Sequence, residues 1–267
     1  MNIYLFEYAN DLTFEEYQHV RSIKVSTRHV THVGLSCLEK LFRFPFSVTH
    51  LDLRDKMGLT TEKDMEWLVR VLSHPDCTIT SLSMFHQYQE NKELQALFCK
   101  IVSLELVGNH LSRRNQHIVE TVVAILSHNV IRKLVLFDYT FEIEEINRIA
   151  EALEHNQTIS TFHLKNTSRW ERNGHHPEYS LRLMDAIKAN NTIRDVIVDD
   201  FQHPERWVEV VRRNPRINHL RLISRFESHS QLLEKALQIN RDRRARILAS
   251  GVTSPIVQKR IFALLIW

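Results

Sequence analysis

Short apolar segments recur along the chain with one spacing of hydrophobic and polar positions. Each has apolar residues at its first, fourth and sixth positions, and the last two lie two residues apart, as on one face of a β-strand. The pattern predicts a strand in each segment, with one face buried. The segments are "VTHVGL" from residue 30, "VTHLDL" from 48, "ITSLSM" from 79, "IVSLEL" from 101, "IRKLVL" from 131, "ISTFHL" from 159, "IRDVIV" from 193 and "INHLRL" from 217.

Longer segments between these predicted strands have helical periodicity. In "EIEEINRIAEALEHN", residues 142–156, apolar side chains at Ile143, Ile146, Ile149 and Leu153 form one stripe, as on an amphipathic helix. The same spacing predicts further helices over residues 61–74, 114–129, 177–191, 204–215 and 230–240.

The strand and helix pair repeats along most of the sequence. The first inward residue of each predicted strand is Leu5, Val33, Leu51, Leu82, Leu104, Leu134, Phe162, Val196 or Leu220, at intervals of 18 to 34 residues with a mean of about 27. Such self-similarity is typical of a leucine-rich repeat. We therefore predict an α/β solenoid of about nine irregular units, a curved arc with parallel strands on its concave face and helices on its convex face.

Residues 149–166, "IAEALEHNQTISTFHLKN", resemble the helix, Asn and strand of leucine-rich repeat proteins of the ribonuclease-inhibitor type. Similar units occur in tropomodulin-like actin-capping proteins, Ran GTPase-activating proteins and leucine-rich effectors of intracellular bacteria. The resemblance implies one solenoid over residues 1–240, with residues 241–267 as a capping segment of the same domain. It implies the fold far more strongly than the function, because this scaffold hosts many unrelated activities.

The stretch "LELVGNHLS", residues 104–112, is the best-preserved unit. In the family, an Asn five residues after the first Leu forms a hydrogen-bonded ladder between units. Only Asn109 and Asn10 hold that offset in this chain. We therefore expect most turns to be satisfied by water or by local main-chain bonds, and we expect Gly108 with Asn109 to mark the turn that leaves the strand.

The side chains that the repeat leaves free on the concave face predict a partner-binding site. An apolar patch with a charged rim is typical of protein-binding surfaces. Two other interpretations stay open: the patch is covered by the chain's own termini or by a neighbouring molecule, or the register is shifted by one residue and the patch faces inward. The predicted site comprises Phe85, Glu105, Val107, Lys133, Val135, Phe137, His163 and Lys165.

The polar loop over residues 166–180 is a second candidate. It carries Trp170 between two arginines and should project from the rim after a strand, and loops on rigid scaffolds often carry function. The alternative is that Trp170 folds back onto the adjacent helix.

Composition argues against several kinds of chemistry. The chain has 267 residues, a net charge of +3 and three cysteines without CxxC pairing, which favours a cytoplasmic protein without disulfides or zinc ribbons. His175 and His176 in "GHHPE" lack a zinc-ligand spacing, and no glycine-rich phosphate loop occurs. We expect no metal, no cofactor and no enzymatic activity. The amino terminus lacks a signal-peptide pattern, and no segment is long and apolar enough to cross a membrane.

The carboxyl-terminal part has two basic or apolar features. The run "NRDRRAR", residues 240–246, follows the last predicted helix, so we expect its cations to complement the helix carboxyl end; contact with nucleic acid or anionic lipid is the alternative. The apolar segment Ile261–Trp267 is expected to cap the last repeat, with membrane or partner-helix docking as the alternative.

The sequence thus predicts a non-enzymatic scaffold that binds a protein partner, rather than nucleic acid, on its concave face. If the resemblance to bacterial effectors holds, the partner is a host protein and this chain is delivered into the host cell. The alternative is a GTPase-activating protein of the Ran type, which would call for a concave-face arginine or polar cluster near the amino-terminal units. Asp52 and Arg54 in "LDLRDK" are the candidates for it.

Overall fold

The computed structural model of the protein describes residues 2–5, 22–25, 48–54, 62–85, 92–108, 116–139, 141–165, 177–198, 204–222 and 230–250. It divides into two compact units. The first comprises Met1–Phe141 with Lys165–Arg169, and the second comprises Glu142–Leu164 with Trp170–Trp267. Predictions for Trp170, most of the 166–180 loop and the segment 251–267 lie outside the described residues.

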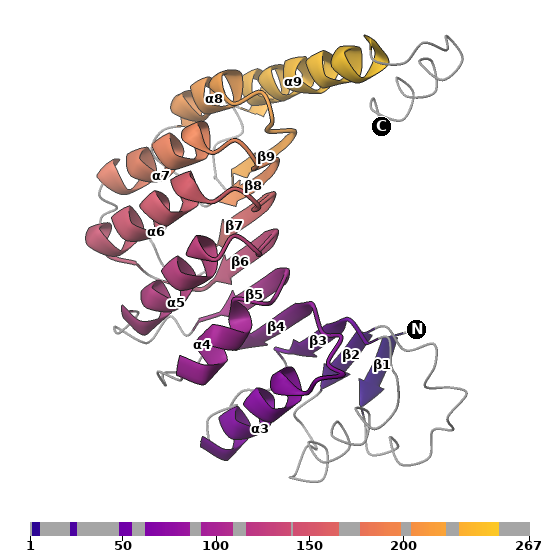
Figure 1. Ribbon diagram of the computed structural model, residues 1–267. Coiled ribbons are helices and arrows are strands. Elements are labelled where there is room, and N and C mark those ends of the chain that lie inside the picture. The colour runs from indigo at the N-terminus through magenta and orange to yellow at the C-terminus, as the bar shows by residue number, and fades with distance from the viewer. Residues whose placement is uncertain are drawn as a thin grey trace. The chain divides into compact units, whose positions relative to one another are not determined.

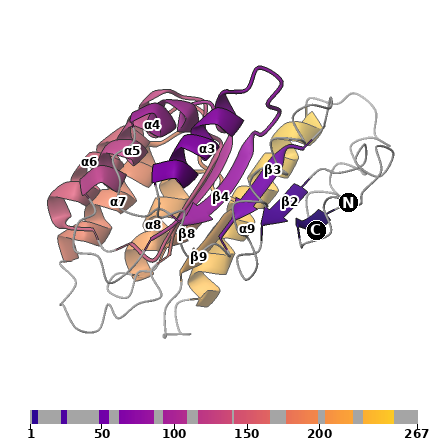
Figure 2. The ribbon, with the colours of Figure 1, turned by 90° about the horizontal axis from the view of Figure 1, so that it is seen from below.

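In the first unit, parallel strands pair in chain order, and each pair shares one register. The described helices of this unit lie along one face of the strands, and none of them lies on the opposite face, which we call the open face (Figures 1 and 2). The elements are β1 (Asn2–Leu5), β2 (Ser22–Val25), β3 (His50–Leu53), α3 (Glu62–Ser73), β4 (Ser81–Phe85), α4 (Lys92–Phe98), β5 (Ser103–Val107), α5 (Gln116–Ser127) and β6 (Lys133–Phe137).

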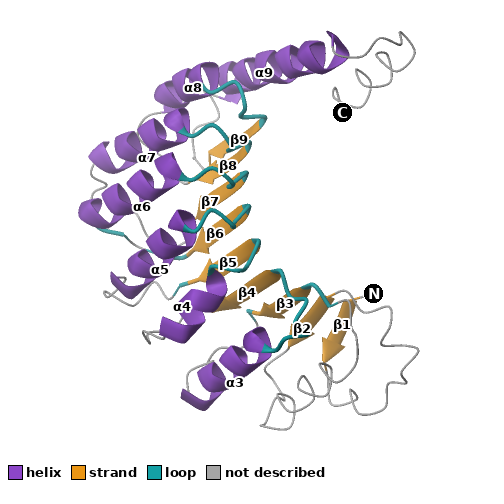
Figure 3. Cartoon of the chain, viewed as in Figure 1, coloured by secondary structure: helices purple, strands orange, loops and turns teal. Residues whose placement is uncertain are grey.

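The second unit repeats this alternation of helix and parallel strand (Figure 3). Its elements are α6 (Ile143–His155), β7 (Thr161–Lys165), α7 (Pro177–Ala189), β8 (Asp195–Val198), α8 (Pro204–Arg213), β9 (His219–Leu222) and α9 (Ser230–Ser250). In α6, the predicted stripe is buried at Ile146, Ile149 and Leu153, and Glu142 forms a capping box with Glu145. The helical periodicity in the sequence therefore identified this element and its buried face.

Burial confirms the predicted strand register from β3 onward. The first inward residues Leu82, Leu104, Leu134, Phe162 and Val196 are all fully buried. Each is followed two residues later by another buried apolar residue, because alternate side chains of a strand share a face. Burying these two rows against the helices supplies the apolar core of each unit.

A repeated pair of main-chain hydrogen bonds fixes the register between successive strands. The carbonyl of Thr80, just before β4, accepts N–H groups from both Val102 and Ser103, at 2.9 and 3.0 Å. In the second unit, the carbonyl of Ser160 accepts from Arg194 and Asp195, at 2.8 and 3.0 Å. Each repeat therefore presents one acceptor to two successive donors of the next repeat.

The amino-terminal strands differ from the prediction. β2 pairs with β1 and with β3, so Ile23 occupies the register position between Ile3 and Leu51. The predicted strand over 30–35 lies outside the described residues. The stretch "VRSIKV", residues 20–25, carries the first-fourth-sixth apolar pattern at Val20, Ile23 and Val25, but the sequence prediction did not include it. Leu5 is predicted from the sequence as the first inward residue of its strand. Leu5 aligns with Val25, so it is the second inward residue of β1.

Helix α9 also differs from the prediction. It continues from Ser230 to Ser250, past the end predicted at residue 240. The basic run at 240–246 therefore lies inside the helix, and the last helical turn holds no basic residue. Charge complementing the helix end cannot explain this run. No described helix has the length and apolarity that a membrane span requires.

Asparagine side chains join successive repeats of the second unit. Asn156, Asn190, Asn214 and Asn240 are each at most 4% exposed. The Nδ2 of Asn190 donates to the carbonyl oxygens of Leu153 and Asn156, at 2.7 and 2.8 Å. The Nδ2 of Asn214 and of Asn240 donate in the same way to carbonyls at the preceding helix end. We call these four residues the asparagine ladder.

The same asparagines also hold the turn that follows. The Oδ1 of Asn190 accepts the N–H groups of Thr192 and Ile193, at 2.8 and 3.0 Å. Asn156 makes the equivalent bonds to Thr158 and Ile159. Each side chain therefore satisfies buried main-chain groups that could find no water there.

The asparagine ladder occupies a different position in the repeat from the one that the family pattern predicts, which is five residues after the first inward residue. Asn156, Asn190 and Asn214 each precede the first inward residue of the next strand by six positions. In the described part of the first unit, that position holds Asp76, Phe98 or His128 instead. Asn109, which holds the offset predicted for a ladder, lies outside the described residues.

Gly108 lies where two repeats of the first unit come closest. Its N–H donates to the carbonyl of Phe137 at 2.7 Å. A Cβ at this position would lie 2.7 Å from the carbonyl oxygen of Asp138 and 2.8 Å from the ring of Tyr139. Glycine is therefore required by close packing against the segment that follows β6.

We expect Asn190→Ala to lower the free energy of unfolding by about 2–4 kcal/mol, because it leaves several buried main-chain donors and acceptors without partners. Urea denaturation followed by circular dichroism measures the change. Asn191→Ala is the matched control, since Asn191 is exposed. Equal effects of the two substitutions would contradict the ladder.

We expect Gly108→Ala to lower the free energy of unfolding by about 1–3 kcal/mol, because the added methyl group overlaps a main-chain oxygen that cannot rotate away. Thermal unfolding followed by circular dichroism tests this. A variant as stable as the wild type would show that the two repeats do not approach as closely as described.

Candidate partner-binding face

The open face of β3–β6 is the face of the first unit opposite its helices. The register arranges its side chains in rows that run across the strands. The middle row is Asp52, Ser83, Glu105 and Val135. The row before it is His50, Ser81, Ser103 and Lys133, and the row after it contains Phe85, Val107 and Phe137, with Arg54 just beyond β3.

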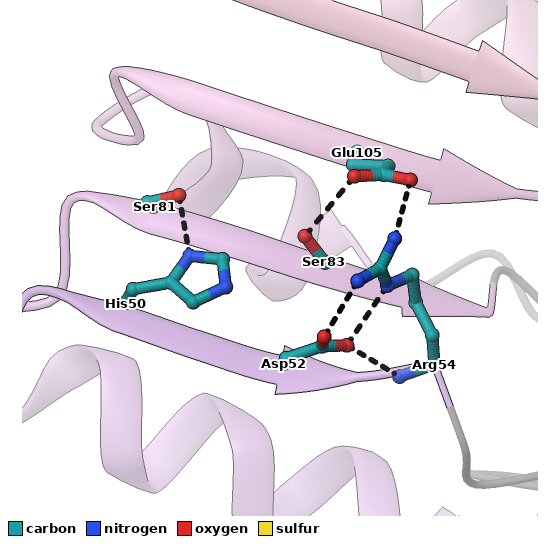
Figure 4. A network of polar contacts seen from close by, with 6 residues as sticks. All are labelled: His50, Asp52, Arg54, Ser81, Ser83 and Glu105. Atoms are coloured by element: carbon teal, nitrogen blue, oxygen red, sulfur yellow. Dashed lines mark hydrogen bonds and ion pairs between the residues drawn. The ribbon is translucent and has the colours of Figure 1, made fainter. Parts of the chain in front are cut away.

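A polar cluster on this face is centred on Arg54 (Figure 4). Its Nε donates to Asp52 Oδ1 at 3.0 Å and its Nη2 to Asp52 Oδ2 at 2.7 Å. Its Nη1 donates to Glu105 Oε1 at 2.9 Å, across the intervening strand β4. Ser83 on that strand donates to Glu105 Oε2 at 3.4 Å. Two carboxylates thus hold one guanidinium, and the three groups together carry one net negative charge.

The electrostatics of the cluster keep Asp52 ionised near pH 7. Burial would raise the pKa of Asp52, but the hydrogen bonds from Arg54 outweigh it and hold that pKa below its usual range. The side chain of Asp52 is 7% exposed and that of Arg54 is 40% exposed. Nδ1 of His50 lies 2.7 Å from Ser81 Oγ, and burial lowers the pKa of His50, with Asp52 opposing this effect. His50 is therefore neutral near pH 7.

The apolar part of the face is smaller than the sequence predicted. Val107 aligns with Phe85 on one side and Phe137 on the other, which confirms that these residues are neighbours. However, Val107 is 7% exposed and Val135 is 4% exposed, whereas the two phenylalanines are half-buried. Of these four predicted apolar residues, Phe85 and Phe137 therefore supply the exposed surface.

The remaining predicted residues divide between the units. Lys133 is exposed on β6, and the carbonyl of Lys165 accepts a hydrogen bond from the N–H of Asp138, at 2.8 Å. His163 belongs to the second unit, where its Nε2 lies 3.2 Å from Asp195 Oδ2.

A second polar cluster lies in that unit. Asp195 on β8 lies between His163 on β7 and His219 on β9, with Oδ1 of Asp195 2.6 Å from Nδ1 of His219. Burial would raise the pKa of Asp195, but hydrogen bonds with the two histidines outweigh it and lower that pKa. The carboxylate thus links three adjacent strands.

The described residues give no support to metal or thiol chemistry. They contain no group of three or more His, Cys, Asp or Glu placed to hold a metal ion. Burial raises the pKa of the thiols of Cys77 and Cys99, which disfavours their reactive thiolate form. Cys37 and the pair His175 and His176 lie outside the described part of the chain.

Sequence reasoning missed the connection between Arg54 and Glu105. The sequence prediction gives Asp52 and Arg54 only a GTPase-activating role, and it gives Glu105 only a place in the charged rim of the apolar patch. The signal was available, because the aligned repeats place Asp52 and Glu105 in one row with Ser83 between them. An arginine at the end of a strand can span that distance.

Comparisons with known proteins add little about function. No protein-family model matches the sequence, and no curated protein matches it. A solved structure described as "Leiomodin-1 Actin-Binding Site 2 (ABS2)" resembles this chain with 16% sequence identity and a TM-score of 0.44, over 52% of this chain and 80% of that chain. So remote a likeness carries no functional argument. The parallel strands that alternate with helices are themselves consistent with a leucine-rich-repeat-like solenoid.

We expect Asp52→Asn to lower the free energy of unfolding by about 1–2 kcal/mol at pH 7, since it weakens a partly exposed ion pair. The lowered pKa of Asp52 means that its contribution is present above its unfolded pKa, near 4, and is lost as pH falls through its folded value. The difference between wild type and variant should therefore shrink from pH 6 to pH 3 in urea titrations. A difference that is constant with pH would contradict this assignment.

Proposed function

We propose that this chain is a non-enzymatic leucine-rich repeat scaffold of the ribonuclease-inhibitor type, which binds a partner protein on the open face of β3–β6. The proposed architecture is the irregular arc of about nine units that the sequence predicts, with this face on its concave side. One observation carries the proposal: half-exposed Phe85 and Phe137 lie beside a pre-organised charged cluster on one face.

The apolar component supplies affinity. Phe85 and Phe137 come from strands on either side of β5 and are supported from below by buried Val107. Aromatic side chains that are held in place lose little conformational freedom on binding, and they are frequent in the centres of interfaces.

The polar component supplies selectivity. Asp52, Arg54 and Glu105 already bond to one another before any partner arrives, so their geometry costs little to maintain. Their net negative charge favours a partner that presents a basic group next to an apolar one and disfavours an acidic partner.

The same cluster weighs against a GTPase-activating role. An arginine that stabilises a transferring phosphoryl group must direct its charge at the phosphate. Arg54 directs three of its nitrogens at carboxylates, which neutralise it and repel phosphate. We therefore favour binding over catalysis, and we propose no cofactor.

The cellular setting rests on the resemblance of the repeats to effectors of intracellular bacteria. On that basis the proposed partner is a host protein, and the protein acts in the host cytoplasm. A eukaryotic cell lysate is accordingly the first source in which to search for it.

We expect the double substitution Phe85→Asp/Phe137→Asp to abolish capture of a specific partner from such a lysate, because it places two charges in the apolar centre of the face. Affinity capture with mass spectrometry compares it with the wild type. Val130→Asp is the matched control, since Val130 is an exposed apolar residue of a turn in the same unit.

Circular dichroism must show that the double variant is folded. A folded double variant that retains every partner would overturn the proposed site. Stimulated GTP hydrolysis by small GTPases in the presence of this protein would overturn the non-enzymatic assignment.

A further inference from the structure

Three arginines in the second unit come from three successive repeats. Arg194 precedes β8, Arg216 lies in the turn before β9, and Arg244 lies on α9. Arg194 and Arg216 are exposed, and Arg244 is half-buried. We call these residues the arginine row.

Hydrogen bonds of the asparagine ladder fix the main chain on which the arginine row lies. Arg194 follows Asn190 by four residues, and its carbonyl accepts N–H groups from the segment leading into β9. Arg216 donates its own N–H to Asn214 Oδ1 at 3.0 Å. Asn240 bonds to the carbonyls of Asn214 and Ile217, on either side of Arg216. Arg244 lies one helical turn after Asn240, on the same side of α9.

The charges of the row act on one another. Burial lowers the pKa of Arg244, and the positive charges of Arg194 and Arg216 lower it further. Across the described ranges, none of these three side chains forms an ion pair. The nearby acids of α9 have other partners: Glu234 pairs with Arg241, and Asp242 accepts from Gln238.

Three converging cations without carboxylate partners repel one another, and an anion removes that repulsion. Guanidinium groups suit carboxylates because each offers two parallel N–H donors. The row follows the repeat direction, so an extended chain with several acidic side chains can meet all three arginines at once. Since the basic run lies inside α9, helix-end charge does not account for Arg244.

We propose that the arginine row binds an acidic peptide segment of a partner protein through its aspartate and glutamate side chains. Nucleic acid fits less well, because single strands need exposed aromatic side chains on which bases stack. Among the aromatic residues of the second unit whose side chains the structure describes, Phe162 and Trp207 are at most 1% exposed. This surface is independent of the open face of β3–β6.

The test is fluorescence anisotropy with a fluorescein-labelled peptide of ten glutamates at low salt. We expect Arg194→Ala/Arg216→Ala/Arg244→Ala to weaken binding about tenfold. The control Arg206→Ala/Arg212→Ala/Arg221→Ala removes the same charge from other exposed arginines of this unit and should change binding less than about twofold. The Phe85→Asp/Phe137→Asp variant should bind the peptide within about twofold of wild type, so failure of one proposal does not imply failure of the other.

Three outcomes would overturn the proposal: no binding of the peptide to wild type, equal losses in both triple variants, or tighter binding of a ten-nucleotide single strand that depends on the same arginines. Thermal unfolding supplies a second readout. Arg244→Gln should keep or raise the melting temperature because it relieves repulsion, whereas a structural role for this arginine would lower it.

Discussion

The acceptance of two successive N–H groups by a single carbonyl before each strand fixes how one repeat follows another. The bond pattern recurs at Thr80 and at Ser160, in sequences that otherwise share little. Because it locks strand offset, it also determines which side chains line up across the sheet. The polar cluster around Arg54 and the aromatic pair around Val107 both depend on that alignment, since neither is assembled from neighbours in sequence.

The two units differ in the residue that stands where each helix ends and the turn to the next strand begins. The second unit uses buried asparagines that bridge from one helix end to the next. In the described part of the first unit, apolar Phe98 or an exposed polar residue takes that position, and a glycine allows close approach at Gly108. Buried asparagine side chains thus link the helix ends of the second unit, whereas the described part of the first unit has no asparagine at that position.

The strands and helices from residue 48 onward were largely predictable, because periods of two and 3.6 residues report burial directly. Strand β2 was equally predictable, because Val20, Ile23 and Val25 carry the same apolar spacing, but the prediction placed a strand at residues 30–35 instead. The end of α9 was missed because its later turns are rich in arginine, which gives no apolar stripe. In the candidate site, the sequence identified Phe85, Val107 and Phe137 as neighbours, but it could not show that the valine is buried, because alternation along a strand gives the face of a side chain and not its exposure. The Arg54 cluster depends on a long side chain reaching over a strand, which periodicity does not encode.

The asparagine ladder has a consequence for how such a chain can change its length. Asn190, Asn214 and Asn240 bond to carbonyls of the repeat before them, so a repeat of the second unit is not an interchangeable module. Removing or inserting one preserves the ladder only if the junction falls at the same point of the repeat and keeps the asparagine six residues before the first inward residue of the strand. The rungs themselves stand 34, 24 and 26 residues apart, so a repeat can change its length between its strand and its next helix while the junction at the asparagine is kept.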